Sequence, residues 1–146
     1  MRVVRFKAAH LQLLQGRLQG AQLHMSAEIA RPESAHMLEG QCESFSAFDG
    51  ELLIGCAGLM PMWPGRAVAW ALLSEDAGRY MRQIHRATKG FLQQSQWTRI
   101  EAFVVKDFYA GQKWMHMLGF ECETPEGAMR KYTPDGQDCF LYSLVR

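Results

Sequence analysis

The stretch over residues 99–123, RIEAFVVKDFYAGQKWMHMLGFECE, constrains the fold more than any other part of the chain. Its first seven residues, 99–105, are mostly apolar and include β-branched and aromatic side chains, which predicts a buried strand. Trp114 and Leu118 then lie four positions apart, a spacing typical of the apolar face of a short helix. Gly119 can adopt the left-handed conformation that commonly ends a helix. The segment therefore predicts a strand and a helix in immediate succession, with the chain re-entering a strand after Gly119.

The length and charge of the chain limit the classes of protein to which it can belong. With 146 residues, of which 48% are hydrophobic, it can bury one substantial core but is short for two domains. We therefore expect a single domain over residues 1–146. The formal net charge is only +1, and charges of one sign form no long run. Nucleic acid and anionic membranes are disfavoured as partners for this reason.

Four widely spaced cysteines, Cys42, Cys56, Cys122 and Cys139, form no Cys-x-x-Cys pair. Because neither zinc-ligand spacing nor a compact disulfide framework is visible, we expect reduced thiols and no metal site. The first ten residues, MRVVRFKAAH, lack the apolar core of a signal peptide, and no apolar run is long enough to span a bilayer. These features predict a soluble protein of the cytoplasm.

The N-terminal part of the chain is predicted to hold one strand followed by helical segments. Residues 2–6 read as a short strand, and the leucines from Leu11 onward are spaced as on a helix that reaches Ala21. Apolar residues are sparse over residues 23–40, and Pro32 breaks a helix. We interpret that segment as irregular or as a second short helix.

Three strands are predicted in the middle of the chain. Residues 43–48 alternate between polar and apolar, Asp49-Gly50 is a two-residue hairpin turn, and residues 51–59 are almost continuously apolar. A loop containing Pro61, Pro64 and Gly65 separates them from residues 67–73, AVAWALL, which are apolar enough for a central strand covered on both faces.

A long helix and a final strand complete the predicted order. Ser74 is a candidate N-cap, and Met81, Ile84 and later apolar residues trace one face of a helix that reaches residue 95. Residues 139–145, CFLYSLV, read as the last strand and follow a turn over residues 132–136.

The order of these elements resembles that of the Gcn5-related N-acetyltransferases (GNAT), whose last helix usually ends in a Tyr-x-x-x-Gly-Phe pattern comparable to Met115 to Phe120 here. The resemblance covers essentially the whole chain. It implies an α/β (α+β) fold with a mixed, mostly antiparallel sheet, a central splayed pair of parallel strands, and helices on both faces. It also implies acetyl-CoA, or another acyl-CoA, as a ligand and an amine as the acceptor.

Several segments are similar to the small acetyltransferase-like proteins of tailed phages and prophages, which are themselves similar to an internal virion protein family of short-tailed phages. The segments are GCAGL, WPGRAVAWALLS, RIEAFV, F-x-x-G-x-x-W-x-x-x-LGF and MRKYTPDGQD. This resemblance implies a phage- or prophage-encoded protein located in the host cytoplasm or in the virion. It leaves open a phage structural partner, a host protein partner and an oligomeric state.

The resemblance to GNAT proteins also assigns a cofactor site. The pantetheine would pair as an extra strand with the backbone of the strand at residues 67–73, and the pyrophosphate would bind the free N–H groups at the start of the long helix. The implied pantetheine residues are Trp70, Ala71, Leu72 and Leu73, and the implied pyrophosphate residues are Ala77, Gly78, Arg79, Tyr80 and Met81.

The pyrophosphate turn departs from the family pattern Arg/Gln-x-x-Gly-x-Gly/Ala. Tyr80 and Met81 occupy positions where small residues are usual, and the acidic Asp76 opposes a phosphate. Arg79 and Arg82 are able to restore the anion site by charge-assisted hydrogen bonds, or they form only a solvated helix face. The sequence leaves both interpretations open.

Acyl transfer to an amine requires a base and benefits from an acid that protonates the leaving thiolate. Met115 stands where the family has its tyrosine, so Tyr109 becomes the candidate acid, with His116 as an alternative. Glu101 is the candidate base, since partial burial would raise its pKa, unless strand alternation turns it to solvent. Other candidate bases are Glu43, Glu51 and His85.

Two functions are compatible with these residues. The first is an acyl-CoA-dependent N-acyltransferase, and it is supported by the complete element order and by Gly78. The second is a catalytically silent phage protein that retains the fold and acts by binding, as a virion or assembly component or as a factor that binds a host protein. The altered pyrophosphate turn and Met115 favour this second function.

Overall fold

The computed structural model describes residues 1–18 and 32–146 and contains one seven-stranded sheet in the order β1-β2-β3-β4-β5-β7-β6. The strands are β1 (Arg2–Arg5), β2 (Glu43–Asp49), β3 (Leu52–Trp63), β4 (Arg66–Leu73), β5 (Arg99–Val105), β6 (Glu121–Cys122) and β7 (Cys139–Val145). The described helices are α1 (His10–Leu13), α3 (Pro32–Gly40), the 3₁₀-helix η2 (Glu75–Tyr80), α4 (Met81–Gln94) and α5 (Tyr109–Leu118).

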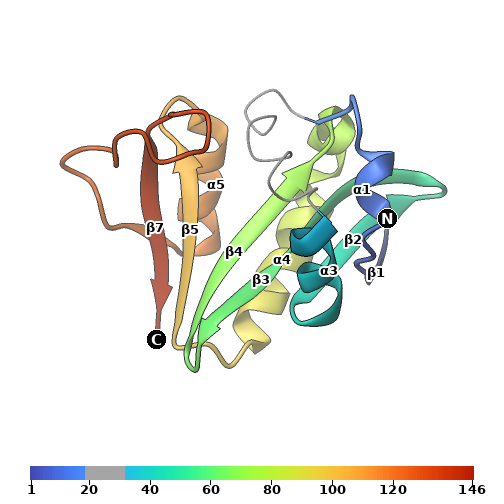
Figure 1. Ribbon diagram of the computed structural model, residues 1–146, viewed down its shortest axis with the longest axis horizontal. Helices are drawn as coiled ribbons and strands as arrows, with labels where there is room; N and C mark the ends of the chain where they lie inside the picture. The colour runs from blue at the N-terminus through green and yellow to red at the C-terminus, as the bar shows by residue number, and fades with distance from the viewer. Residues whose placement is uncertain (19–31) are drawn as a thin grey trace.

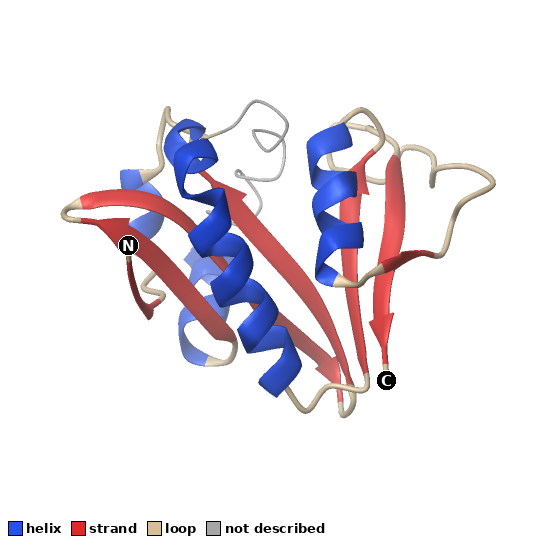
Figure 2. Ribbon diagram, turned by 180° about the vertical axis from the view of Figure 1, so that it is seen from behind, coloured by secondary structure: helices blue, strands red, loops and turns tan. Residues whose placement is uncertain are grey.

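Helices cover both faces of the sheet. Figure 1 shows α1 and α3 in front of β1 to β4, and Figure 2 shows α4 and α5 on the opposite face. All neighbouring strands are antiparallel except β4 and β5, which are parallel and joined by α4 in a right-handed crossover (Figure 2). The predicted fold class and the predicted parallel pair are confirmed.

The parallel pair separates after a short ladder. Only three residue pairs join β4 to β5, namely Arg66 with Arg99, Ala67 with Ile100, and Val68 with Glu101. Beyond them β5 continues to pair with β7 up to Val105, while β4 continues to pair with β3. The sheet therefore opens between β4 and β5, as both ribbon views show. We call this region the splay.

The core fixes which side chains of β5 face each side of the splay. Ile100, Ala102 and Val104 are buried in one cluster with Met115 and Leu118 of α5. Because side chains alternate along a strand, the residues between them point to the other face, on which α1 and α3 lie. We call this the front face, since it faces the viewer in Figure 1.

The hairpin prediction is confirmed, whereas the loop after it is shorter than predicted. Asp49 pairs with Leu52, and Gly50 has a φ of 58° that suits a two-residue turn. The following strand extends beyond residue 59 through Pro61 to Trp63, with an irregular register between Pro61 and Trp63. An irregularity of this kind accommodates a proline, which cannot donate to the ladder.

The helices of the N-terminal part are shorter than expected. The helix predicted from Leu11 is the single turn α1: residues 14–17 form turns, Leu18 forms a β-bridge with Ser74, and Ala21 lies outside the described residues. Pro32 is the first residue of α3, so the segment contains the second short helix that was one of the two interpretations. This position tolerates proline since the first N–H groups of a helix have no partner within it.

The predicted long helix begins differently from the expectation. Ser74 has the extended backbone of an N-cap but makes no capping hydrogen bond, and the next six residues form the 3₁₀-helix η2. The α-helix itself begins at Met81. At the other end of the fold, α5 ends as predicted at Gly119, whose φ is 96°.

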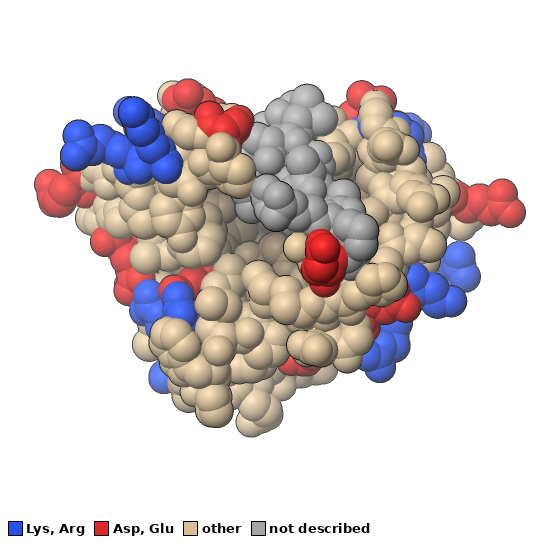
Figure 3. Space-filling model, in the orientation of Figure 1, with Lys and Arg blue, Asp and Glu red and all other residues tan. Residues whose placement is uncertain are grey.

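The four cysteines are free thiols. Burial raises the pKa of Cys56 and of Cys139 to about 11, so neither is ionised at neutral pH. Across residues 1–18 and 32–146, no helix combines the length and the apolar character needed to cross a membrane. In Figure 3, charges of both signs lie around the margin of the front face, and uncharged residues form most of its centre.

Candidate active site

An ion pair closes the splay where β4 and β5 still pair. Glu101 of β5 is 4% exposed, and Arg66 of β4 donates to both of its carboxylate oxygens, from Nε at 2.8 Å and from Nη2 at 2.7 Å. Arg99 lies 3.5 Å from the same carboxylate and also pairs with Glu123. The carboxylate is therefore buried but held between two guanidinium groups.

This ion pair overturns the pKa expected for Glu101. Hydrogen bonds from Arg66 lower its pKa, and this effect, together with the charges of Arg66 and Arg99, outweighs the rise that burial alone would cause. The alternative in which strand alternation turns Glu101 to solvent is wrong as well, because the side chain is buried. Glu101 is thus an ionised hydrogen-bond acceptor at neutral pH and a weak base.

Aromatic side chains surround this ion pair on the front face. The Arg66 guanidinium lies 4.3 Å from the centre of the Trp63 ring. Tyr132, from the chain between β6 and β7, packs on Phe103 of β5 with ring centres 4.8 Å apart. Partial burial raises the pKa of Tyr132, and the nearby Glu101 adds to this effect. The front side of the splay therefore combines a fixed carboxylate with phenol and indole rings.

The four residues expected to bind pantetheine lie on β4 beyond the last pair with β5. Their other edge is occupied by β3, where Trp70 pairs with Gly58 and Leu73 pairs with Gly55. Leu72 and Leu73 are buried, at 2% and 6% exposure. Trp70, Ala71, Leu72 and Leu73 thus lie on the part of β4 that has left β5, and the binding of pantetheine there stays a prediction.

The turn expected to bind pyrophosphate has fewer available N–H groups than predicted. The N–H of Ala77 donates to the carbonyl of Ser74 at 3.0 Å, and that of Met81 donates to the carbonyl of Gly78. Ala77 is also completely buried. At least these two of the five expected donors are already bonded, because the turn is a 3₁₀-helix, in which N–H groups bond the carbonyl three residues earlier, and not the open start of an α-helix.

Two acidic residues near this turn, Asp76 and Asp49, already have partners. Asp76 accepts from Arg17 at 3.0 Å and from Arg79 at 3.3 Å, and its pKa is lowered chiefly by the Arg17 hydrogen bond. The Tyr80 hydroxyl donates to Asp49 in the β2–β3 hairpin at 2.5 Å. The repulsion expected between Asp76 and a phosphate is therefore largely offset.

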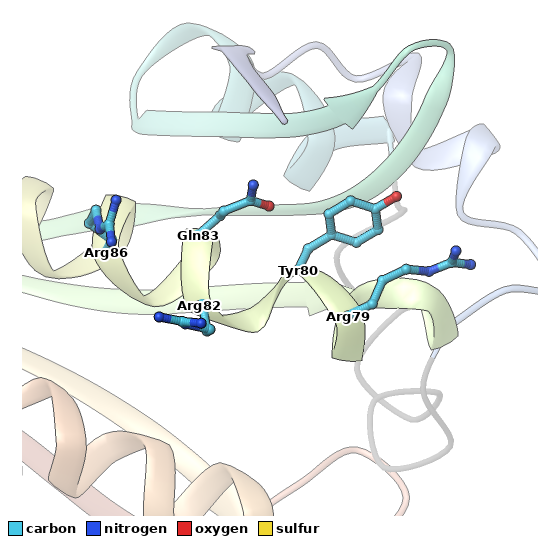
Figure 4. A pocket seen from close by; sticks show the side chains of 5 residues that line it. All are labelled: Arg79, Tyr80, Arg82, Gln83 and Arg86. Carbon is cyan, nitrogen blue, oxygen red and sulfur yellow. The ribbon is translucent and has the colours of Figure 1, made fainter.

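A surface hollow of about 410 Å³ adjoins the turn and the first turns of α4 (Figure 4). It is lined by Arg79, Tyr80, Arg82, Gln83 and Arg86. We call it the arginine hollow. Tyr80 and Met81 obstruct the pyrophosphate turn less than their size suggests. Both side chains pack in part against the buried cluster of Ile54, Leu73, Ala77 and Ile84.

The α5 candidates are dispersed. Tyr109 lies at the first position of α5 and is 73% exposed, whereas Met115 is buried in the core. His116 stacks edge-on against Tyr142 at 5.4 Å. His85 of α4 accepts a hydrogen bond from Trp114 of α5 at 3.3 Å. The fold brings Tyr109 into no contact with Glu101 that would link the two predicted catalytic residues.

Sequence reasoning missed Arg66, Tyr132 and Arg86. Arg66 was detectable only through the register that sets β4 beside β5, which depends on residues more than 30 positions apart. Tyr132 was assigned to a turn, and nothing local indicated that it returns to β5. Arg86 follows Arg82 by four positions, a spacing that does place two side chains on one helix face.

Solved structures of other proteins share this fold. The chain is similar to the ribosomal-protein-alanine N-acetyltransferase from Brucella melitensis, with a TM-score of 0.73, 11% identity and 100% of both chains covered. It is similar to the ribosomal-protein-S18-alanine N-acetyltransferase from Escherichia coli, with a TM-score of 0.73 and 15% identity over 99% of this chain and 92% of that one. A GNAT-family acetyltransferase from Bacillus anthracis gives a TM-score of 0.66 and 12% identity over 98% and 93%.

No protein-family model and no curated protein matches the sequence. At 11–15% identity, the structural likeness establishes the fold alone. The chain therefore has the GNAT acyltransferase fold that its element order predicted.

Proposed function

We propose that the protein is an acyl-CoA-dependent N-acyltransferase that transfers an acetyl group from acetyl-CoA to an amine. The observation that carries this proposal is the splay, in which β4 leaves β5 after three residue pairs. We expect an extended, amide-bearing ligand to lie in this opening beside β4, at Trp70 and Leu72. The acetyltransferases with the same fold support this assignment.

In this proposal the acceptor amine approaches from the front face, where Glu101 and Tyr132 lie. Glu101 accepts a hydrogen bond from the incoming ammonium and orients it, because a carboxylate with a lowered pKa removes protons poorly. The ammonium first loses one proton to solvent water, and the neutral amine then attacks the thioester carbonyl. The tetrahedral adduct loses its second nitrogen proton to water, its carbon–sulfur bond breaks, and the thiolate leaves while the amide forms. Tyr109 remains the proposed donor of a proton to this thiolate.

Calorimetric titration of the purified protein with acetyl-CoA and with CoA tests the proposal. We expect saturable binding of both ligands. No detectable heat at millimolar ligand would contradict the proposed activity.

The Gly78→Val variant locates the diphosphate in the same experiment. A Cβ added at Gly78 meets no atom of the described residues within 4 Å, so this position has space for the start of a side chain, and circular dichroism checks that the variant is folded. If the diphosphate lies over the turn, the variant binds acetyl-CoA more weakly by about 1–3 kcal/mol, the cost of hydrogen bonds to a charged group. Unchanged affinity would show that the diphosphate lies elsewhere.

A second candidate function is a catalytically silent binding protein encoded by a phage or prophage. Two observations favour it, namely the buried Met115 at the position of the family tyrosine and the bonded N–H groups of Ala77 and Met81. The partner in that case is a virion component or a host protein. The absence of acetyl-CoA binding in the titration would favour this function over the first.

A further inference from the structure

We propose that Arg82 and Arg86 of the arginine hollow recognise the 3′-phosphate of the acyl-CoA through their guanidinium side chains. This inference rests on the proposed function and names the part of the ligand that the chain selects. It predicts that the protein binds CoA more tightly than dephospho-CoA, which lacks only the 3′-phosphate.

The side chains around the hollow are suited to an anion. Three of its five lining residues, Arg79, Arg82 and Arg86, are arginines, and none is acidic. Guanidinium groups bind phosphate oxygens through paired, charge-assisted hydrogen bonds. Figure 4 shows these side chains extending from η2 and from the first turns of α4. Two carboxylates bonded to residues at or beside the hollow, Asp76 and Asp49, already accept hydrogen bonds from Arg17, Arg79 and Tyr80.

Two of these arginines have no polar partner within the described part of the chain. Among residues 1–18 and 32–146, neither Arg82 nor Arg86 forms an ion pair or a side-chain hydrogen bond, and both are exposed. By contrast, Arg17, Arg66, Arg79 and Arg99 each bond a carboxylate. Arg82 and Arg86 therefore retain their full capacity for a ligand.

The spacing of the arginines indicates more than one phosphate. Arg82 and Arg86 lie one helical turn apart on α4, and Arg79 of η2 precedes Arg86 by seven positions, roughly 10 Å at a rise of about 1.5 Å per residue. A row of this length can hold two phosphate groups side by side. A ligand with a diphosphate and a separate 3′-phosphate matches it, with the diphosphate next to Arg79 at the turn.

Because backbone N–H groups of the turn are already bonded, arginine side chains are needed to bind the phosphates. Ala77 and Met81 use their N–H groups within η2 and at its end, so the backbone presents a weaker anion site than an open helix start. Arginine side chains can replace these backbone donors. They bind a phosphate away from the backbone, so they do not require small residues at positions 80 and 81.

The test compares CoA with dephospho-CoA by calorimetry, using the parent protein and the double variant Arg82→Ala/Arg86→Ala. We expect the parent to bind CoA about tenfold more tightly than dephospho-CoA, as one or two charged hydrogen bonds would give. In the double variant this difference should disappear through weaker CoA binding, while the affinity for dephospho-CoA stays nearly unchanged. Circular dichroism checks that the variant is folded.

Lys89→Ala is the matched control, because Lys89 is an exposed cation on the same helix that does not line the arginine hollow. It should leave the difference between the two ligands intact. Equal affinity of the parent for both ligands, or a difference that persists in the double variant, would overturn the inference while leaving the proposed function standing. If the parent binds neither ligand, the proposed function fails and this inference fails with it.

Discussion

At the scale of single residues, the Arg66–Glu101 pair determines how charge is distributed in the splay. Glu101 is more deeply buried than Arg66, whose side chain is 22% exposed, and it accepts both hydrogen bonds of a bidentate pair. A buried carboxylate without such a partner would be protonated at a higher pH. The pair therefore keeps one fixed negative charge on the front face at neutral pH.

The lowered pKa of Glu101 makes its contribution to stability depend on pH. Because its folded-state pKa lies below the unfolded value of about 4.5, the contribution is complete above that value and is lost as the pH falls through the folded-state pKa. We expect Glu101→Gln to lower the free energy of unfolding by about 1–3 kcal/mol at pH 7. The deficit should shrink below about pH 4, because the parent carboxyl also becomes neutral there.

Urea denaturation at pH 7 and pH 3 measures this effect. Glu121→Gln is the control, since Glu121 is exposed on the short strand β6, and it should change stability little at either pH. A deficit of the same size at both pH values would show that the carboxylate charge of Glu101 does not stabilise the fold.

At the scale of elements, two glycines in helical segments have opposite roles. Gly119 ends α5 in a left-handed conformation at a φ of 96°, which side chains rarely adopt. Gly90 lies inside α4, where an added Cβ meets no atom within 4 Å. The first glycine is required by backbone geometry, whereas the second only weakens a helix.

We therefore expect opposite signs from the two alanine substitutions. Gly119→Ala should destabilise the protein by about 1–2 kcal/mol through backbone strain, because its Cβ would make only an ordinary contact with Leu144 at 3.8 Å. Gly90→Ala should stabilise it by about 0.5–1 kcal/mol. Urea denaturation of both variants tests this pair of values, and each variant serves as the control for the other. Destabilisation by Gly90→Ala would mean that α4 is not helical at that position.

At the scale of the whole molecule, the splay divides the sheet into two parts held together by three residue pairs of β4 and β5 and by helix contacts such as Trp114 with His85. A ligand in the splay would contact both parts and would stabilise only the folded state. The stability gained depends on its concentration relative to its dissociation constant.

Acetyl-CoA should therefore raise the midpoint of thermal unfolding. At a concentration one hundred times its dissociation constant, we expect about 2.7 kcal/mol of stabilisation, or roughly 5–10 °C for a chain of this length. Differential scanning calorimetry measures the shift, with adenosine as a control ligand that lacks phosphates. A midpoint unaffected by acetyl-CoA at millimolar concentration would argue against a ligand in the splay.

Local patterns were sufficient for most of the elements. The strands at residues 99–105 and 139–145 have the predicted bounds, and Asp49-Gly50 and Gly119 form the predicted turn and helix end. These features depend on side-chain periodicity and on backbone conformations that few residues adopt, both of which act within a few positions of the chain.

The charge and geometry of the candidate site required the tertiary structure. The sequence placed Glu101 on a strand, but only the β4–β5 register sets Arg66 against it and lowers its pKa. The 3₁₀ turn before α4 and the packing of Tyr132 on Phe103 likewise depend on distant segments. A pKa and a contact are set by every group nearby in space, and the folded chain brings those groups together from positions far apart in sequence.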